Sequence, residues 1–539
     1  MRPSATALAL SLFCVHGYAF QLPFTIPFLS NTPQNPLSTA FLPAAAPPNK
    51  VAIIGAGAGG SSAAFWIAKA KERFGLDVEV DVFERNDYIG GRATVVYPYN
   101  DTELEPIELG ASIFVRINKN LWRATEEFGL ERISFGDDGD VMGLWDGKDV
   151  ILTVCTTGGG YGGWWDTLKI IWRYGLQAPR RTEALVKTMA DKFLYLYGSS
   201  APRFDNLTGL ADTLDWTPVI AQTAAEYLEA QGVDRRFTHE LVDAATRVNY
   251  GQNVDSIHAL EGLCSLAATD ASSVKGGNFR IFEEFLRRSN ASVHLNTNVL
   301  SLSHDEASGA WLLSTSMTRS ALAYRAVIIA APLHSSSLAL APETLLAPVP
   351  EQPYVHLHVT LLSTPSPTPN ATYFGLGAGK APTEMLTTYQ GVRQGTTEEP
   401  EFNSMTYHGK VQRATGENWE GADGDEWVVK IFSKKRISDE WLANMFGKVG
   451  WVLRKEWDAY PVLPPTTSFP PVKLAKGLYY VNAFEPFIST METETISARN
   501  IVDLLLRDEF NAAICPQKAE DAEETPLTES ADFVLGWDC

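Results

Sequence analysis

The spacing of apolar residues changes near Lys50, where the first regular elements are predicted. Residues 51–54 form a short apolar run, residues 61–74 carry apolar side chains at helical spacing, and residues 78–83 again have the pattern of a strand. A Gly-rich turn separates the first strand from the helix. The pattern therefore predicts one β-strand, α-helix, β-strand unit.

The middle of the chain has a different pattern of apolar residues. From about residue 121 to 245 aromatic and helical segments dominate, with Gly-rich interruptions such as residues 157–163, which predicts a separate helical portion. Strand patterns return at 293–302 and 324–331, and those at 355–362 and 427–432 are predicted to form a second sheet. Near the end, a short apolar strand at 477–482 precedes a predicted helix at 490–506.

Composition and charge limit the class of protein. The chain has 539 residues, 45% hydrophobic and 20% charged, which is typical of a globular protein with more than one folding unit. Its formal net charge of −20 would repel polyanions, so we set nucleic acid aside as a partner.

The N-terminus predicts a secretory signal. Arg2 is followed by an apolar run at 5–15 and by small residues around Ala19, where we expect cleavage. The run is shorter than the roughly 20 residues of a transmembrane helix, and we expect no transmembrane segment. The mature protein is therefore expected in the secretory pathway, in a lysosome or vacuole or outside the cell.

Other local patterns agree with an oxidising compartment. N-glycosylation sequons lie at Asn100, Asn206, Asn290 and Asn370. The cysteines that remain after signal removal permit one or two disulfides but require none; they are Cys155, Cys264, Cys515 and Cys539. His356 and His358 would share one face of a strand, but without a third ligand we interpret them as ordinary strand residues and predict no metal site.

The turn after the first strand carries a GxGxxG motif. Gly55 permits a tight turn, Gly57 lets the backbone approach a pyrophosphate, and Gly60 allows close packing of helix on strand. The free N–H groups at the start of the helix would face the anion. Glu84 ends the second strand, where a carboxylate can accept hydrogen bonds from a ribose. Together these residues predict a dinucleotide site.

The next run, ERNDYIGGR at 84–92, resembles the large group of flavoproteins related to amine oxidases. The resemblance implies FAD as the cofactor, with Arg85, Gly91 and Arg92 near it and the Arg92 guanidinium available to the diphosphate. It also implies that Gly110 and Ala111 pass near the flavin.

The same resemblance implies further cofactor contacts. Val299, at the end of a strand, would lie near the adenine end through its backbone. Glu485, Met491 and Glu492 would belong to the closing contact, where the N-terminus of a helix points toward the flavin and stabilises its anionic reduced form.

Longer runs resemble the prenylcysteine oxidases, also called prenylcysteine lyases. The most specific is RVNYGQ at 247–252. It is joined, in the family's order, by KGGN at 275–278, WVVKIFS at 427–433, AYP at 459–461 and LYYVN at 478–482 with Met-Glu at 491–492. The resemblance covers residues 50–507.

The family resemblance implies an FAD-dependent thioether oxidase. It would cleave farnesyl- or geranylgeranyl-cysteine with O₂ and water to cysteine, a prenyl aldehyde and H₂O₂. Such chemistry needs positioning, exclusion of competing water and an apolar channel for the isoprenoid. A soluble protein with peripheral lipid contact would suit this substrate.

Candidate residues for the substrate pocket are Arg247, Tyr250 and Phe487. Arg247 offers a cation for the substrate carboxylate, although a structural ion pair is an equal alternative. Phe487, with Pro486, departs from the small residues that we expect in the family at this place and would reshape the pocket. Further aromatic candidates, each of which is also compatible with an ordinary core position, are Trp164, Trp165 and Phe279.

These observations predict an α/β protein with a discontinuous FAD-binding Rossmann-type domain of the amine-oxidase-like kind and a mixed α+β substrate domain. The expected plan is a signal peptide at 1–19, a Pro-rich linker at 20–49, FAD-binding parts at 50–120, 246–332 and 471–510, a helical substrate part at 121–245, a sheet-rich substrate part at 333–470, and a flexible tail at 511–539. Two alternatives stay open: an FAD oxidase of the same fold that acts on an amine or a lipid-like metabolite, and a non-catalytic flavin- or prenyl-lipid-binding protein.

Overall fold

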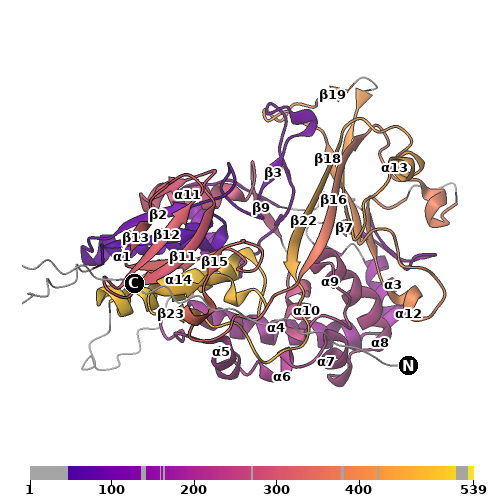
Figure 1. Ribbon diagram of the computed structural model, residues 1–539. Coiled ribbons are helices and arrows are strands. Elements are labelled where there is room, and N and C mark those ends of the chain that lie inside the picture. Colours follow the sequence, from indigo (N-terminus) through magenta and orange to yellow (C-terminus); the bar gives the residue numbers. More distant parts are fainter. Residues whose placement is uncertain are drawn as a thin grey trace, which may run out of the picture. The chain divides into compact units, whose positions relative to one another are not determined.

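A six-stranded sheet forms the base of the predicted cofactor domain in the computed structural model (Figure 1). Its strand order is β10-β2-β1-β14-β24-β23, and every pairing is parallel except that of β23 with β24. The strands are β1 (Lys50–Ile54), β2 (Glu79–Phe83), β10 (Ser292–His294), β14 (Ala326–Ile329), β23 (Lys473–Ala475) and β24 (Leu478–Tyr480). They come from three distant stretches of sequence, which confirms the predicted discontinuous fold.

The structure describes residues 47–134, 141–157, 160–161, 164–268, 271–377, 381–421, 424–516 and 532–539. The predicted signal peptide and nearly all of the predicted linker lie outside these residues.

Helices cover this sheet. They are α1 (Ala58–Phe74), α2 (Lys119–Phe128), α11 (Phe279–Ser289) and α14 (Met491–Phe510). Helix α1 packs against both α11 and α14, and α2 packs against the same two helices. The apolar residues of β1 and β14 are almost completely buried, as is typical of parallel strands covered on both faces.

A separate four-stranded sheet consists of β11 (Val299–Asp305), β12 (Ala310–Thr315), β13 (Leu322–Tyr324) and β15 (Ala339–Leu340). Its first three strands lie between β10 and β14 in the sequence, and β15 follows β14. The strand predicted at 293–302 is therefore two strands, β10 and β11. The backbone N–H of Thr297 donates to the Glu84 carbonyl in the turn between them, which allows the chain to leave one sheet and enter the other.

An eight-stranded sheet forms the second region (Figure 1). In spatial order its strands are β22 (Val452–Pro461), β16 (Tyr354–Thr364), β21 (Trp427–Ser433), β18 (Ser404–Lys410), β17 (Glu384–Thr387), β6 (Val141–Trp145), β7 (Val150–Thr157) and β8 (Gly160–Tyr161). The predicted helical part at 121–245 missed β6, β7 and β8, which extend this sheet.

Helices from the middle of the chain fill the lower part of the view in Figure 1. They are α3 (Trp164–Tyr174), α4 (Gln177–Leu194), α5 (Leu207–Thr213), α6 (Thr217–Ile220), α7 (Ala224–Ala230), α8 (Arg235–Phe237), α9 (Asp243–Tyr250) and α10 (Ala259–Leu266). Helix α10 packs on α4 and α7, and α9 packs on β17. The predicted boundary at residue 246 is therefore wrong, since the chain leaves this helical group only after α10.

The C-terminal segment is held against α1. Cys515 and Cys539 form a disulfide, and the Trp537 ring lies 5.0 Å from that of Phe65 and 5.5 Å from that of Trp66. The Arg73 guanidinium donates to the Gly536 carbonyl at 2.6 Å. The prediction of a flexible tail was thus wrong for residues 511–516 and 532–539. Cys155 and Cys264 are free thiols.

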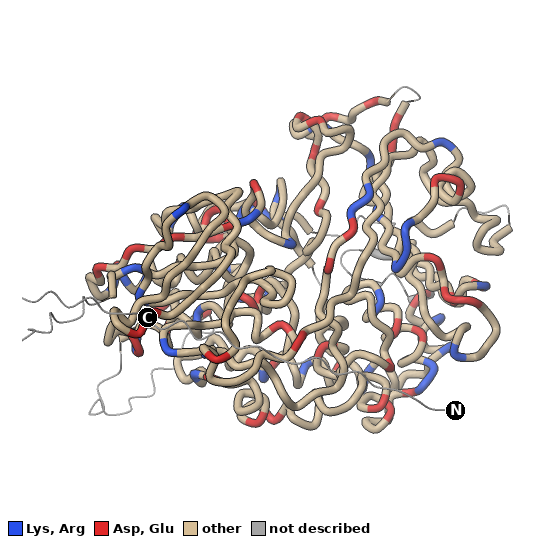
Figure 2. Tube along the Cα trace, in the orientation of Figure 1, with Lys and Arg blue, Asp and Glu red and all other residues tan. Residues whose placement is uncertain are grey.

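Charged residues of both signs are interspersed along the described chain (Figure 2). Among the helices that the structure describes, none is long and apolar enough to cross a membrane. The sequon residues Asn100, Asn206 and Asn290 are exposed, and Asn370 is half-buried.

Candidate active site

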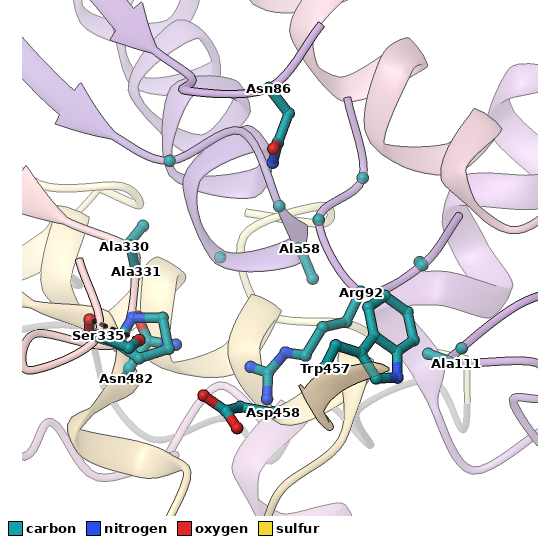
Figure 3. Close-up of a pocket in the computed structure, with 18 of the residues that line it drawn as sticks. Ala58, Asn86, Arg92, Ala111, Ala330, Ala331, Ser335, Trp457, Asp458 and Asn482 are labelled. Atoms are coloured by element: carbon teal, nitrogen blue, oxygen red, sulfur yellow. Dashed lines mark hydrogen bonds between the residues drawn. The ribbon is translucent and has the colours of Figure 1, made fainter. Parts of the chain in front are cut away.

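A cavity of about 610 Å³ lies where the two regions meet (Figure 3). One wall comes from the turn between β1 and α1, the end of β2, and the segments around Arg92 and Gly110. The opposite wall comes from β16, β21, β22 and the residues that lead into α14. The cavity is therefore built from segments that are far apart in the sequence.

The β1–α1 turn requires glycine for two different reasons. Gly55 has φ +106°, and a Cβ there would lie 2.5 Å from the Ala330 carbonyl oxygen. A Cβ at Gly60 would collide with the Gly55 carbonyl oxygen, so Gly60 serves close packing and does not line the cavity. Gly57 lines the cavity at the start of α1, where no side chain caps the helix. The N–H groups of its first turn remain available to an anion.

Glu84 lies beside this turn at the end of β2. One carboxylate oxygen accepts from the Ala56 N–H at 2.9 Å, and the other accepts from the N–H and side-chain amide of Asn86 at 2.9 and 2.7 Å. These bonds hold the buried carboxylate at the cavity wall. Arg85 lines the same end of the cavity.

Arg92 reaches across the cavity toward the second region (Figure 3). Its guanidinium donates to the Ala459 carbonyl at 3.1 Å and pairs with Glu485, which also accepts from the Tyr354 hydroxyl. Glu485 is 1% exposed, so this ion pair is shielded from solvent on the acid side. Gly91 faces Gly57 at φ +60°, where a Cβ would lie 3.3 Å from the Gly57 Cα.

Gly110 and Ala111 line the cavity next to an indole ring. A Cβ at Gly110 would lie 2.6 Å from the Trp457 ring, so only glycine permits this close packing. The Lys430 ammonium supports the segment from behind, since it donates to the Glu108 carbonyl at 2.7 Å and to the Ser112 hydroxyl at 3.0 Å. Burial raises the pKa of the Glu108 carboxyl and lowers the pKa of Lys430.

The start of α14 closes the cavity. Met491 lines it, together with Asn482 and Glu494. Within the described part of the chain, the side-chain oxygen of Asn482 and one oxygen of Glu494 have no hydrogen-bond partner although both are buried. Burial raises the pKa of Glu494. Two unpartnered polar atoms at a cavity wall are expected where a polar ligand would complete their hydrogen bonds.

Glu492 does not line this cavity, contrary to the sequence-based prediction. Its carboxylate accepts from the N–H groups of Asn120 and Leu121 at 2.8 and 3.0 Å and from the Tyr197 hydroxyl at 2.5 Å. Successive helical residues project in different directions, so Met491 faces the cavity while Glu492 caps α2.

The three predicted substrate-pocket residues are also absent from the cavity wall. Arg247 is fully buried and pairs with the Glu399 carboxylate at 3.3 Å, so the predicted alternative of a structural ion pair holds. Its guanidinium also donates to Thr387, Asn253 and Asn403 at 3.1, 2.7 and 3.2 Å. Tyr250 stands behind Tyr460, which does line the cavity, with ring centroids 5.8 Å apart.

Phe487 packs inside the protein core. Its ring contacts those of Phe484, Phe469 and Trp216 at 5.3, 5.3 and 5.8 Å. Phe279 is likewise outside the cavity lining, and the side chains of Trp164 and Trp165 lie outside the described part of the chain.

The sequence did not reveal most of the cavity wall that the second region contributes. The residues of this wall are Tyr354, Leu357, Phe432, Lys455, Glu456, Trp457, Asp458, Ala459 and Tyr460. The motif at 459–461 and the strand pattern at 355–362 pointed to these segments. Neither indicated that β16 and β22 pair beside the cofactor turn.

The cavity residues present fit a dinucleotide. The uncapped start of α1, the backbone without a side chain at Gly57, and the oriented Glu84 carboxylate are the features that such a ligand needs. Val299 also lines the cavity, as predicted for the adenine end.

Comparison with known proteins agrees with this geometry. Residues 53–128 match a model for an NAD(P)-binding Rossmann-like domain. A putrescine oxidase structure aligns with a TM-score of 0.54 at 15% identity, covering 85% of this chain and 99% of that one. Cyclohexylamine oxidase from Brevibacterium oxydans aligns with a TM-score of 0.52, also at 15% identity, covering 85% and 98%. The fold and site define a dinucleotide-binding protein with the amine oxidase fold.

The family follows from sequence. Residues 162–515 match the prenylcysteine lyase model, and the chain belongs to that family. Prenylcysteine oxidase 1 of Rattus norvegicus is 29% identical, covering 84% of this chain and 88% of the relative. Farnesylcysteine lyase of Arabidopsis thaliana is also 29% identical, covering 85% and 88%.

Proposed function

We propose that the protein is an FAD-dependent oxidase that cleaves the thioether of prenylcysteine. The observation that carries the proposal is the continuous cavity, which extends from the dinucleotide turn at Gly57 to an apolar wall formed by Leu357, Phe432, Trp457 and Tyr460. A cofactor end and an apolar substrate end therefore share one space. Family membership supports the choice of a prenylated thioether as substrate.

The residues that would hold FAD are those of the cofactor end. Glu84 would accept hydrogen bonds from the ribose, and the first turn of α1 would donate to the diphosphate. Asn482 and the start of α14 would contact the flavin. When bound, FAD supplies a two-electron oxidation and passes the electrons to O₂.

The protein's own contribution would be binding, orientation and exclusion of water. The apolar wall would hold the isoprenoid beside the cofactor, while Lys455 and Asp458, on the same cavity, match the carboxylate and ammonium of the cysteine end. One thioether, one O₂ and one water would give cysteine, prenyl aldehyde and H₂O₂. A positioned substrate needs no strong protein base in this scheme.

We expect anaerobic farnesylcysteine to bleach the flavin absorbance of the purified protein. Admission of air should restore the absorbance and release H₂O₂ and cysteine in equal amounts. A saturated S-alkylcysteine of similar length is the matched control, since it fills the same apolar space but lacks the allylic position. Bleaching by putrescine or cyclohexylamine instead would indicate an amine oxidase, and a flavin that no substrate bleaches would indicate a binding protein.

We also propose that the protein matures in the secretory pathway and works in a lysosome-like compartment or outside the cell. The sequons and the Cys515–Cys539 disulfide support this location, because disulfides form in oxidising compartments.

The double variant Cys515→Ser/Cys539→Ser should lower the free energy of unfolding by about 3 kcal/mol, the loop-entropy value for a 24-residue separation. Denaturant unfolding measures this change. Addition of a reductant should lower the free energy of unfolding of the unmodified protein and leave that of the variant unchanged. If the two proteins were equally stable without reductant, the disulfide would have no structural role.

A further inference from the structure

A cluster of two histidines and two acids lies on adjacent strands at the edge of the cavity. In the antiparallel pairing of β16 with β22, His356 lies opposite Asp458 and His358 lies opposite Glu456. Residues two apart on a strand share a face, and directly opposed residues on neighbouring strands are side by side. The register therefore brings all four side chains together.

The distances suit coordination of one ion. The Nδ1 atom of His358 is 3.4 Å from one Glu456 oxygen, and the Nε2 atom of His356 is 3.8 Å from the other. One ligand atom from each of these residues lies within 4.8 Å of those of the other two. In a tetrahedral zinc site with bonds of about 2.0 Å, ligand atoms are about 3.3 Å apart. Small side-chain rotations would therefore bring the three groups onto one ion.

Asp458 orients one of the imidazoles. Its carboxylate is 3.2 Å from the His356 Nδ1 atom, so it can accept a hydrogen bond from a protonated Nδ1. That arrangement fixes the tautomer in which the His356 Nε2 lone pair is free toward Glu456. A carboxylate behind a metal-binding histidine is a frequent arrangement in zinc sites.

We propose that His356, His358 and Glu456 bind a divalent transition-metal ion, with Zn²⁺ as the best match to two imidazoles and a carboxylate. Harder ions such as Mg²⁺ and Ca²⁺ favour all-oxygen sites. Three protein ligands leave one tetrahedral position open, and Glu456 also lines the cavity. The site stands on the strand register and the side-chain distances and does not depend on the proposed reaction.

The histidine pair alone was insufficient evidence in the sequence, because no third ligand could be identified. The third ligand comes from β22, about 100 residues further along the chain. In the alternative arrangement, the cluster holds no ion, and the imidazoles contact only the Glu456 and Asp458 carboxylates. Metal stoichiometry separates the two arrangements.

The test uses the flavin-loaded, tag-free protein, first treated with chelator and then titrated with zinc in a calorimeter. We expect one zinc ion per chain at about micromolar free zinc, and an X-ray absorption spectrum with two imidazole ligands. His356→Asn and His358→Asn should each weaken zinc binding more than about tenfold, and Asp458→Asn should weaken it by about tenfold.

His304→Asn is the matched control. His304 lies on β11, where its ring packs against Trp311 with centroids 5.2 Å apart, and it takes no part in the cluster. This variant should bind zinc as the unmodified protein does. Absence of stoichiometric zinc, or equal zinc binding by the His356→Asn and His358→Asn variants, would overturn the proposal. Flavin content, measured on the same samples, should stay constant, which separates loss of zinc from loss of the cofactor.

Discussion

Gly57→Val should yield a folded protein without flavin. Gly57 has φ −80° and ψ −165°, a conformation that valine adopts readily. A Cβ there would be 3.8 Å from the nearest protein atom, the Gly91 Cα, which is ordinary van der Waals contact, so the branch point of the new side chain fits. The side chain would occupy the space where the pyrophosphate is expected to approach the start of α1.

We expect FAD affinity to fall more than about a hundredfold, equivalent to roughly 3 kcal/mol of binding free energy. Absorbance of the purified protein and titration of the cofactor-free form with FAD measure this loss. Circular dichroism should be unchanged. By contrast, Gly55→Val should disrupt the fold itself, because Gly55 has positive φ and faces the Ala330 carbonyl.

Gly377→Val provides the matched control for Gly57→Val. A Cβ at Gly377 would meet open space, and this residue lies outside the cavity. The control should keep its full flavin content. If Gly57→Val also kept it, the cofactor could not lie against the start of α1, and the proposed binding mode would be wrong.

The second large effect concerns Glu261, whose replacement by Gln should stabilise the protein at alkaline pH and not at acid pH. Glu261 is fully buried on α10, and burial raises the pKa of its carboxyl to about 8. The neighbouring His258 cannot compensate the charge, because burial lowers its pKa to about 4. Deprotonation of Glu261 therefore places an uncompensated charge in the core.

The direction of the pH dependence follows from proton binding. Below about pH 4.5 the carboxyl is protonated in both the folded and the unfolded protein, so its titration does not change the free energy of unfolding there. Between about 4.5 and 8 the folded protein binds the extra proton, and stability falls as pH rises. Above about pH 8 the loss of stability is complete and amounts to at most roughly 5 kcal/mol, from the size of the pKa shift. Denaturant unfolding of Glu261→Gln and the unmodified protein at pH 5 and 8.5 measures the difference.

Glu226 offers a control with the opposite sign. It occupies the same third position of helix α7, but its capping-box hydrogen bonds with Thr223 lower its pKa at the surface. Glu226→Gln should therefore lose stability near neutral pH and lose none in strong acid. A pH-independent effect of Glu261→Gln would show that its carboxyl titrates normally.

The cofactor half of the site was largely predictable from sequence. The β1–α1 turn, Glu84 and the GGR segment lie close together in the sequence. A short motif is therefore sufficient to place them all in or next to the β1–α1–β2 unit. Helix α1 begins at Ala58 and β2 ends at Phe83, close to the predicted bounds. Local pattern was sufficient there because the strand, turn and helix are consecutive.

The substrate half could not be predicted in the same way. Trp457 meets Gly110 only because β16 and β22 pair beside the cofactor turn, and periodicity does not say which strands pair. Arg247 and Phe487 have suitable chemistry for a pocket, but their burial depends on distant partners such as Asn403 and Trp216. Residue type determines which chemical groups a chain has, whereas contacts between distant parts of the chain determine which of those groups line a cavity.

The origin of the six-stranded sheet in three distant stretches has a consequence for biosynthesis. Strand β14 receives its second neighbour, β24, about 150 residues after β14 itself has been made. At roughly 5–20 residues per second this is a delay of roughly 7 to 30 seconds, during which one edge of an apolar parallel strand has no partner. Exposed strand edges promote aggregation, so the nascent chain should depend on chaperones until β24 emerges. A ribosome stalled before β24 would therefore carry an aggregation-prone chain rather than a smaller working cofactor domain.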